Sequence, residues 1–116
     1  IGEWQVLYPT EGSAIRPLVE RFLIAHGIGN IDNRLETVSG AFGRVYTRRS
    51  DAVWIISAGV VANEIAEGRL EALPFDTSLT RGPVGLMHRP DEALSPQAQV
   101  FSLAVKNALK KLGLDP

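Results

Sequence analysis

Small hydroxyl residues recur wherever the sequence predicts that a strand passes into a helix. These positions are Thr10 and Ser13 after a first strand, Thr37 and Ser39 after a second, and Ser57 after a third. Ser57 is followed by the small residues Ala58 and Gly59, which complete its turn. In parallel α/β sheets the carboxyl ends of the strands share one edge, where helix N-termini present free backbone N–H groups. Hydroxyl and N–H groups in that place bind anions such as carboxylates. The pattern predicts an anion-binding rim, although each hydroxyl by itself is also typical of an ordinary helix cap.

The elements that would position this rim alternate between strand and helix. Apolar runs and helical spacing predict strands at 5–8, 34–38, 52–56, 70–73 and 83–88, and helices at 13–26, from 39 onward, at 60–67 and at 95–112, with a polar loop at 75–81. Segment 50–73 has the order strand, helix, strand with very short connections, which is typical of a right-handed parallel crossover. We therefore expect an α/β fold with a mostly parallel sheet flanked by helices.

The first predicted helix has clear start and stop signals. Ser13 is expected to cap it, and Pro17 falls near its first turn, where a missing N–H costs least. Gly27 suits the left-handed position after the helix, with Ile28 packing back on Leu23. The last predicted helix has similar signals, since Ser95 precedes Pro96.

The inward positions of these elements predict the hydrophobic core. These positions are Val6, Phe22, Leu35, Val53, Ile55, Ile65, Leu70, Leu73 and Leu86. Truncation of such a side chain, for example Ile55→Ala, is expected to cost about 2–5 kcal/mol.

Composition limits the classes of function. The chain has 116 residues, a formal net charge of −1 and no cysteine. This length fits one domain, and the balanced charge gives no electrostatic reason to expect nucleic acid or an anionic membrane as a partner. Without cysteine, disulfides, thiolate catalysis and zinc–thiolate sites are excluded. The apolar runs are far shorter than the roughly 20 residues that a membrane span requires.

Candidate catalytic and metal-binding residues are few. His26 and His88 are isolated in the sequence, and His26 falls at a predicted helix C-terminus, where a cation is favoured by the helix dipole. No HExxH, GxSxG, Walker or GxGxxG motif occurs. Glu64 and Glu67 are expected on the exposed face of a short helix. We therefore expect no catalytic residue, no metal and no cofactor.

The order of the motifs resembles the effector-binding domain of LysR-type transcriptional regulators. The matching segments are Leu7-Tyr8-Pro9, Glu36-Thr37-Val38-Ser39, Trp54-Ile55-Ile56-Ser57-Ala58-Gly59, Glu64-Ile65-Ala66-Glu67-Gly68-Arg69-Leu70-Glu71-Ala72-Leu73-Pro74, Gly82 to Arg89, and Ser95-Pro96 with Phe101. Together they cover essentially the whole chain. Each motif alone is moderately specific for this family, whereas their order and spacing together are strongly specific for it.

The resemblance implies one lobe of a two-lobed clamshell of the type II periplasmic-binding-protein kind. Residues 1–89 would form the second lobe, and 90–116 a return segment and C-terminal helix that packs on a first lobe absent from this sequence. The chain is then expected to be a C-terminal fragment of a longer bacterial, cytoplasmic and oligomeric regulator. That regulator would bind DNA only through an N-terminal winged helix-turn-helix, with no membrane partner.

The resemblance also implies a sensor that is not an enzyme. Its effector would be a small carboxylate, such as an intermediate of protocatechuate breakdown. The expected effector-binding residues are Thr10, Ser13, Arg16, Thr37, Ser39, Phe42, Ser57, Ala58 and Gly59. Arg16 and Arg44, early in their helices, would supply positive charge if they face the cleft.

Two other classes of function fit parts of the sequence. A lobe of a periplasmic solute-binding protein would have the same fold, and an N-terminal helix-turn-helix in a longer chain would exclude it. A small α/β enzyme would need a nucleophile next to a base, and the sequence places no such pair together.

Overall fold

The structure is a computed structural model that describes residues 1–114, and it divides into two compact units. The first unit is Ile1–Arg81 and the second begins at Gly82. The division falls before the predicted strand at 83–88, whereas sequence analysis placed the lobe boundary after it. Residues 115–116 of the expected C-terminal segment lie outside the described residues.

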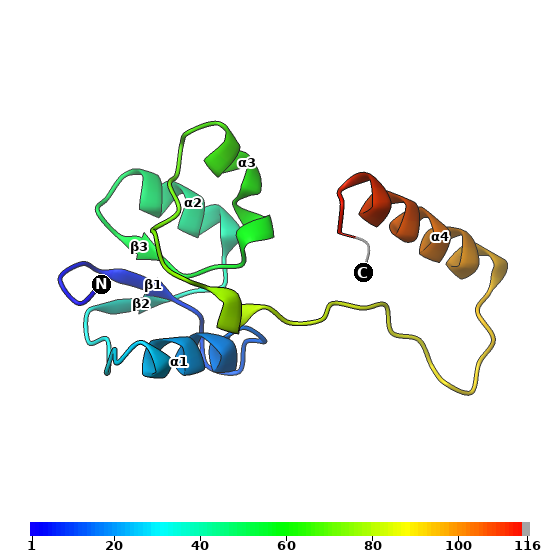
Figure 1. The fold of residues 1–116 in the computed structure, drawn as a ribbon, viewed down its shortest axis with the longest axis horizontal. Helices are drawn as coiled ribbons and strands as arrows, with labels where there is room; N and C mark the ends of the chain where they lie inside the picture. Colours follow the sequence, from blue (N-terminus) through cyan, green and yellow to red (C-terminus); the bar gives the residue numbers. More distant parts are fainter. Residues whose placement is uncertain (115–116) are drawn as a thin grey trace. The chain divides into compact units, whose positions relative to one another are not determined.

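The first unit is built on a three-stranded parallel sheet in the order β2-β1-β3 (Figure 1). Its elements are β1 (Val6–Tyr8), α1 (Arg16–Ala25), β2 (Arg34–Glu36), α2 (Gly40–Arg48), β3 (Val53–Trp54), η1 (Ala58–Val60), α3 (Ala62–Ala66) and η2 (Ser78–Thr80). In the central strand, Leu7 is in register with Leu35 of β2 and Trp54 of β3. The predicted parallel α/β sheet is therefore confirmed for the first three strands.

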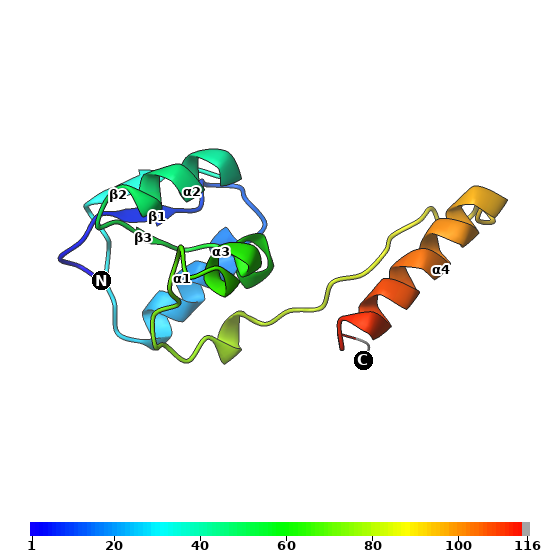
Figure 2. The same ribbon diagram turned by 90° about the horizontal axis from the view of Figure 1, so that it is seen from above.

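The helices lie on both faces of the sheet. Figure 2 shows α2 on one face, with α1 and α3 on the other. The chain moves from β1 to β2 in one direction and from β2 across to β3 in the opposite direction. Because parallel crossovers are right-handed, reversing the direction moves the connecting helix to the other face. We call the two surfaces the α2 face and the α1 face.

The ends of α1 follow local sequence signals, except at the cap. Pro17 occupies its first turn, and Gly27 ends it at φ +67°, where the Ile28 N–H donates to the Leu23 carbonyl at 2.9 Å. Ser13 does not cap the helix, because its hydroxyl donates to the Thr10 carbonyl at 2.7 Å instead. The predicted Ser13 cap is therefore wrong, and α1 begins three residues later, at Arg16.

The α2 face is tightly packed. Gly43 of α2 is buried against the indole of Trp54, and a Cβ at this position would overlap that ring. The helix can approach β3 this closely only because residue 43 has no side chain. Leu7 is fully buried and alternates with Val6 and Tyr8 along β1, so its side chain belongs to this face.

The α1 face holds the hydrophobic core, next to a large hollow. The buried cluster comprises Val6, Tyr8, Val19, Phe22, Leu23 and Ile31. Beside it, a hollow of about 710 Å³ lies among α1, β3, α3 and segment 70–81. The core predictions for Val6 and Phe22 are therefore confirmed.

The other predicted core residues are less buried than expected. Leu35, Val53, Ile55 and Leu70 are only half-buried. Ile65, Leu73 and Leu86 are exposed, so their assignment to the core is wrong. Ile65 and Leu73 line the hollow, which leaves their apolar surface uncovered, and Leu86 lies in an extended exposed segment.

Two predicted strands do not form in the described residues. After Gly68 (φ +69°) ends the turn following α3, segment 70–73 lies along the hollow without strand pairing. Segment 83–88 is extended and exposed throughout. An apolar run becomes a strand only beside a partner strand, and neither segment has such a neighbour in the described part of the chain. The predicted crossover within 50–73 is therefore wrong in its second strand.

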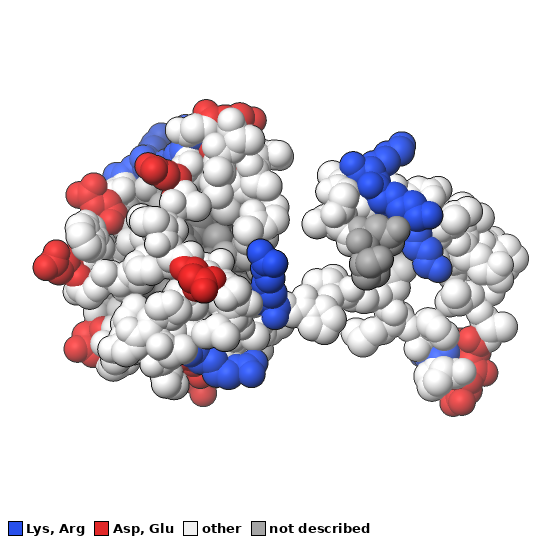
Figure 3. All heavy atoms as spheres, in the orientation of Figure 1, with Lys and Arg blue, Asp and Glu red and all other residues white. Residues whose placement is uncertain are grey.

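The second unit contains α4 (Pro96–Lys111), which forms as predicted. The Ser95 hydroxyl accepts from the Ala98 N–H at 3.2 Å, and Pro96 follows the cap directly. Lys110 and Lys111 lie in the last turn, as the helix dipole favours. In Figure 3 most of the blue side chains of this unit lie along α4, whereas charges of both signs are spread over the first unit. Val100, Phe101 and Leu103 are more than half exposed.

Candidate functional site

The predicted rim follows the carboxyl ends of three adjacent parallel strands. Because the sheet order is β2-β1-β3, Thr37 follows one outer strand, Thr10 follows the central strand, and Ser57 comes shortly after the other outer strand. Backbone hydrogen bonds extend beyond the strands, since Thr37 N–H donates to the Tyr8 carbonyl at 2.9 Å and Ile55 N–H to the Leu7 carbonyl at 3.0 Å. The sheet thus directs all three turns to the same edge.

The three turns use their hydroxyl groups differently. At the second turn, Ser39 Oγ accepts from the Phe42 N–H at 3.2 Å, and Thr37 Oγ1 accepts from the Ser39 N–H at 3.1 Å. A hydroxyl that accepts in a cap keeps its own hydrogen available to donate. At the first turn, the Ser13 hydroxyl is committed to the Thr10 carbonyl. The second turn is therefore the better anion donor of these two.

The third turn is the most open. Ser57, Ala58 and Gly59 are all exposed, and no side-chain hydrogen bond of Ser57 occurs within the described residues. A Cβ at Gly59 would meet nothing within 4 Å. Phe42, the remaining predicted site residue, is part-exposed and stacks on Tyr46 with ring centroids 5.2 Å apart. An aromatic surface thus lies on the first two turns of α2.

Arg16 lies at this edge, but its charge is already matched. Its Nε donates to Glu20 at 2.7 Å, and its Nη1 donates both to Glu36 and to the Pro9 carbonyl at 2.8 Å. Hydrogen bonds to Glu20 and Glu36 raise the pKa of Arg16 further above its usual range. Arg16 thus joins α1 to the ends of β1 and β2, and an incoming carboxylate would compete with two others.

The Tyr8 ring contacts Arg16 and Arg34 at the same edge of the sheet. The Arg16 guanidinium lies 4.6 Å from the centre of the Tyr8 ring, and the Arg34 guanidinium lies 5.3 Å from it. Both distances suit cation–π contacts. Burial raises the pKa of the Tyr8 phenol, against the opposing effect of Arg16. Tyr8 therefore stays neutral at physiological pH and has a structural role.

Arg44 is the second cation at the edge and has spare donors. Its Nε donates to Glu64 at 2.8 Å, and its Nη2 donates to the Val60 carbonyl at 2.6 Å. Its Nη1 lies over Gly40 at the start of α2, close enough to limit a side chain there. Since a guanidinium has five N–H groups, three remain for a ligand. Arg44 therefore connects the second and third turns.

Glu64 holds Arg44 in this position. Glu64 is buried, contrary to the prediction of an exposed helix face, and its ion pair with Arg44 joins α3 to α2. Its own backbone N–H, together with Arg44, keeps the pKa of the Glu64 carboxyl below its usual value, although desolvation opposes this. No sequence pattern links residues 20 positions apart, so the Arg44–Glu64 pair could not be predicted.

A family model described as the LysR substrate binding domain matches residues 1–110. The chain belongs to the LysR substrate-binding domain family. Two curated proteins named HTH-type transcriptional regulator PcaQ, from Agrobacterium fabrum (strain C58 / ATCC 33970) and Rhizobium radiobacter, are each 49% identical to it over 110 residues. The uncharacterized HTH-type transcriptional regulator YdcI of Escherichia coli (strain K12) is 27% identical over 107 residues.

These alignments cover 95% of the chain for both PcaQ proteins and 92% for YdcI, and 35% of each relative. The chain thus spans about a third of the length of the curated relatives it matches. No solved structure was found to match it.

Membership in the LysR family confirms the predicted resemblance and fold class. The family has a periplasmic-binding-protein-like fold, and the parallel sheet flanked by helices agrees with it. The PcaQ alignments cover 95% of the chain, which agrees with motifs that extend over essentially the whole sequence. The relatives are named as transcriptional regulators rather than as enzymes.

Other kinds of site are not evident in the described residues. Between residues 1 and 114, no group of three or more His, Cys, Asp or Glu side chains is placed to hold a metal ion. His26 Nδ1 is 2.8 Å from the Phe22 carbonyl at the end of α1, as expected for a helix C-terminus. No helix in the described part of the chain is both long and apolar enough to cross a membrane.

Proposed function

We propose that the chain is the effector-binding part of a transcriptional regulator and that a small carboxylate binds at the sheet edge described above. The observation that carries the proposal is the position of Arg44, which bonds to the Val60 carbonyl beside the third turn and lies over Gly40 beside Ser39, at the edge where the parallel strands end. Thr10, Ser13, Thr37, Phe42, Ala58 and Gly59 complete the proposed site. Family membership supports ligand binding as the role of this part of the protein.

The geometry favours a particular division of roles. The Ser39 and Thr37 hydroxyls donate to one carboxylate oxygen, while the spare N–H groups of Arg44 donate to the other. Arg16 positions the ends of β1 and β2 rather than pairing with the ligand, because Glu20 and Glu36 already neutralise it. The effector site therefore centres on the α2 start, not on the α1 start.

In the longer regulator, effector binding acts by a shift in populations. A ligand that contacts both lobes of the clamshell favours one arrangement, and that arrangement repositions the DNA-binding heads of the oligomer. DNA is bound by a winged helix-turn-helix outside this sequence, in the bacterial cytoplasm. The effector is an acyclic or lactone carboxylate from protocatechuate breakdown, a proposal that rests on the similarity to PcaQ.

The test is an NMR titration with adipate, and 1,6-hexanediol as the uncharged control. We expect adipate to shift the backbone amides of 39–42 and 58–60, and Ser39→Ala to weaken binding by about tenfold. Ser95→Ala is the matched control, because Ser95 caps α4 with the same 3.2 Å bond as Ser39 caps α2. Shifts confined to the opposite strand ends, near Gln5 and Asn33, would contradict the proposal.

A further inference from the structure

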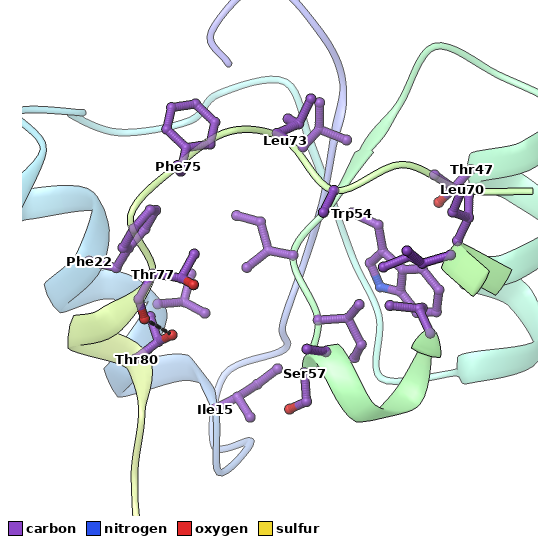
Figure 4. A pocket seen from close by; sticks show the side chains of 18 of the residues that line it. Ile15, Phe22, Thr47, Trp54, Ser57, Leu70, Leu73, Phe75, Thr77 and Thr80 are labelled. Atoms are coloured by element: carbon purple, nitrogen blue, oxygen red, sulfur yellow. Dashed lines mark hydrogen bonds between the residues drawn. The ribbon is translucent and has the colours of Figure 1, made fainter. Parts of the chain in front are cut away.

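The hollow on the α1 face is a second concave site, separate from most of the proposed rim. It has a volume of about 710 Å³ and is lined mainly by apolar side chains, among them Ile15, Phe22, Ile55, Ile65, Leu73 and Phe75. Figure 4 shows the lining side chains around an open space, with Phe22 and Phe75 on one side and Trp54 on the other. Volumes of this order, with apolar walls, are typical of small-molecule sites.

The walls of the hollow expose apolar surface that a compact domain would normally cover. Ile65 is 39% exposed, Leu73 48% and Phe75 41%, although all three line the hollow. Phe75 meets Phe22 edge-on, with ring centroids 6.4 Å apart and ring planes at 85°. A further ring could add to this arrangement, since aromatic rings favour edge-to-face neighbours. Apolar cavities that water fills poorly bind apolar molecules readily.

Several polar groups of the hollow lie at one end, although Thr47 lies elsewhere on its wall. Ser57 and Thr80 lie there with Ile15, in the lower part of Figure 4. The Thr80 hydroxyl donates to the Thr77 carbonyl at 2.6 Å. Arg81 follows directly and also lines the hollow, and no ion pair of Arg81 occurs within residues 1–114. This end therefore offers a cation and the Ser57 hydroxyl, because the Thr80 hydroxyl is already engaged. The rest of the lining is mainly apolar, with Thr47, Thr77 and Glu71 as its other polar residues.

We propose that this hollow binds an aromatic monocarboxylate. The ring lies against Ile55, Ile65 and Phe75, and the carboxylate pairs with Arg81 beside Ser57. A dicarboxylate would have to bury its second charge among apolar side chains, which is costly. This site goes beyond the proposed effector rim, with which it shares only the turn at Ser57 and Ala58.

The experiment is a benzoate titration of the chain, followed by the methyl NMR signals of Ile55, Ile65 and Leu73. We expect saturable shifts at these methyl groups, and binding of succinate at the same methyl groups at least about tenfold weaker. Benzyl alcohol, which has the ring without the charge, should shift the same signals with lower affinity. Absence of benzoate shifts at all three side chains would overturn the proposal.

Two pairs of variants test the two ends of the site. Ile65→Trp fills the hollow and should weaken benzoate binding by about tenfold or more, followed at Ile55 and Leu73. Ile24→Trp makes the same change on the outer side of α1, where Ile24 is 75% exposed, and should leave binding unchanged. Arg81→Gln should reduce benzoate affinity to that of benzyl alcohol, whereas Arg21→Gln on α1 should not. Benzoate binding that resists both Ile65→Trp and Arg81→Gln would overturn the proposal.

The hollow and the proposed effector rim have separate readouts. Adipate acting on the amides of 39–42 tests the rim, and benzoate acting on the Ile55 and Ile65 methyl groups tests the hollow. Loss of the first response with the second intact would contradict only the proposed function. Benzoate shifts confined to 39–42 would contradict only the aromatic site.

Discussion

The two faces of one small sheet are packed in opposite ways. On the α2 face, Gly43 lies directly against Trp54, with no room for one more methyl group. On the α1 face, a hollow of about 710 Å³ lies next to the buried cluster around Phe22. The same strands contribute to both faces, so strand sequence alone does not determine packing density.

The difference in packing gives the two faces different roles. One face holds ligand-binding groups in place, and the other leaves space for a ligand. The close contact on the α2 face fixes the helix that carries Ser39 and Arg44, and a ligand can be bound precisely only by groups that are themselves held in place. The loose packing on the α1 face leaves apolar surface for a ligand to cover. The tight face therefore suits polar recognition, and the open face suits an apolar ring.

The largest expected effect comes from truncating one residue on each face. Leu7→Ala on the tight face should cost about 2–5 kcal/mol, because a fully buried side chain leaves a cavity. Ile55→Ala should cost only about 1–2 kcal/mol, because its side chain is half-buried and borders a space that already exists. Urea denaturation of both variants measures the difference. Equal losses would show that the hollow is closed in solution.

A smaller effect is expected from adding a single methyl group to the tight face. Gly43→Ala should cost about 1–3 kcal/mol, because the new Cβ pushes α2 away from Trp54. Gly59→Ala is the control, since a Cβ there meets nothing within 4 Å. Thermal unfolding of both proteins checks the prediction. An unchanged melting temperature for Gly43→Ala would mean that the two faces are equally loose.

The smallest expected effect concerns the ion pair that joins the faces. The folded-state pKa of Glu64 lies below its unfolded value, first through its own backbone N–H and then through Arg44, so the ionised carboxylate stabilises the fold above the unfolded pKa. This contribution is lost as the pH falls through the lowered folded pKa. Glu64→Gln should therefore flatten the loss of stability in acid, measured as the urea midpoint against pH. Glu67→Gln, which changes an exposed carboxylate next to α3, should retain the steeper loss.

Local signals in the sequence predicted the parts of the fold that depend on neighbouring residues. The Gly27 turn, the Ser39 cap of α2 and the Ser95 cap of α4 are each determined within a few positions, and each is confirmed. Ser13 shows the limit of such signals. Its hydroxyl can bond either to the helix start or to the Thr10 carbonyl, and the structure uses the second.

Features that depend on distant residues could not be predicted. Segment 70–73 has the composition of a strand, but pairing requires a neighbouring strand, and the structure places this segment along the hollow instead. Burial of Glu64 depends on Arg44, which belongs to another helix. The predicted rim residues do reach one edge of the sheet, because parallel topology alone brings them there. Whether that edge binds an effector stays a prediction.

The contact between Gly43 and Trp54 also has an evolutionary consequence. A larger residue at 43 fits without displacing α2 only if position 54 carries a smaller ring or chain. Each change alone is harmful, and only the two together restore the fit. Among relatives of this chain, positions 43 and 54 should therefore vary as a pair, each lineage keeping whichever combination it first acquired.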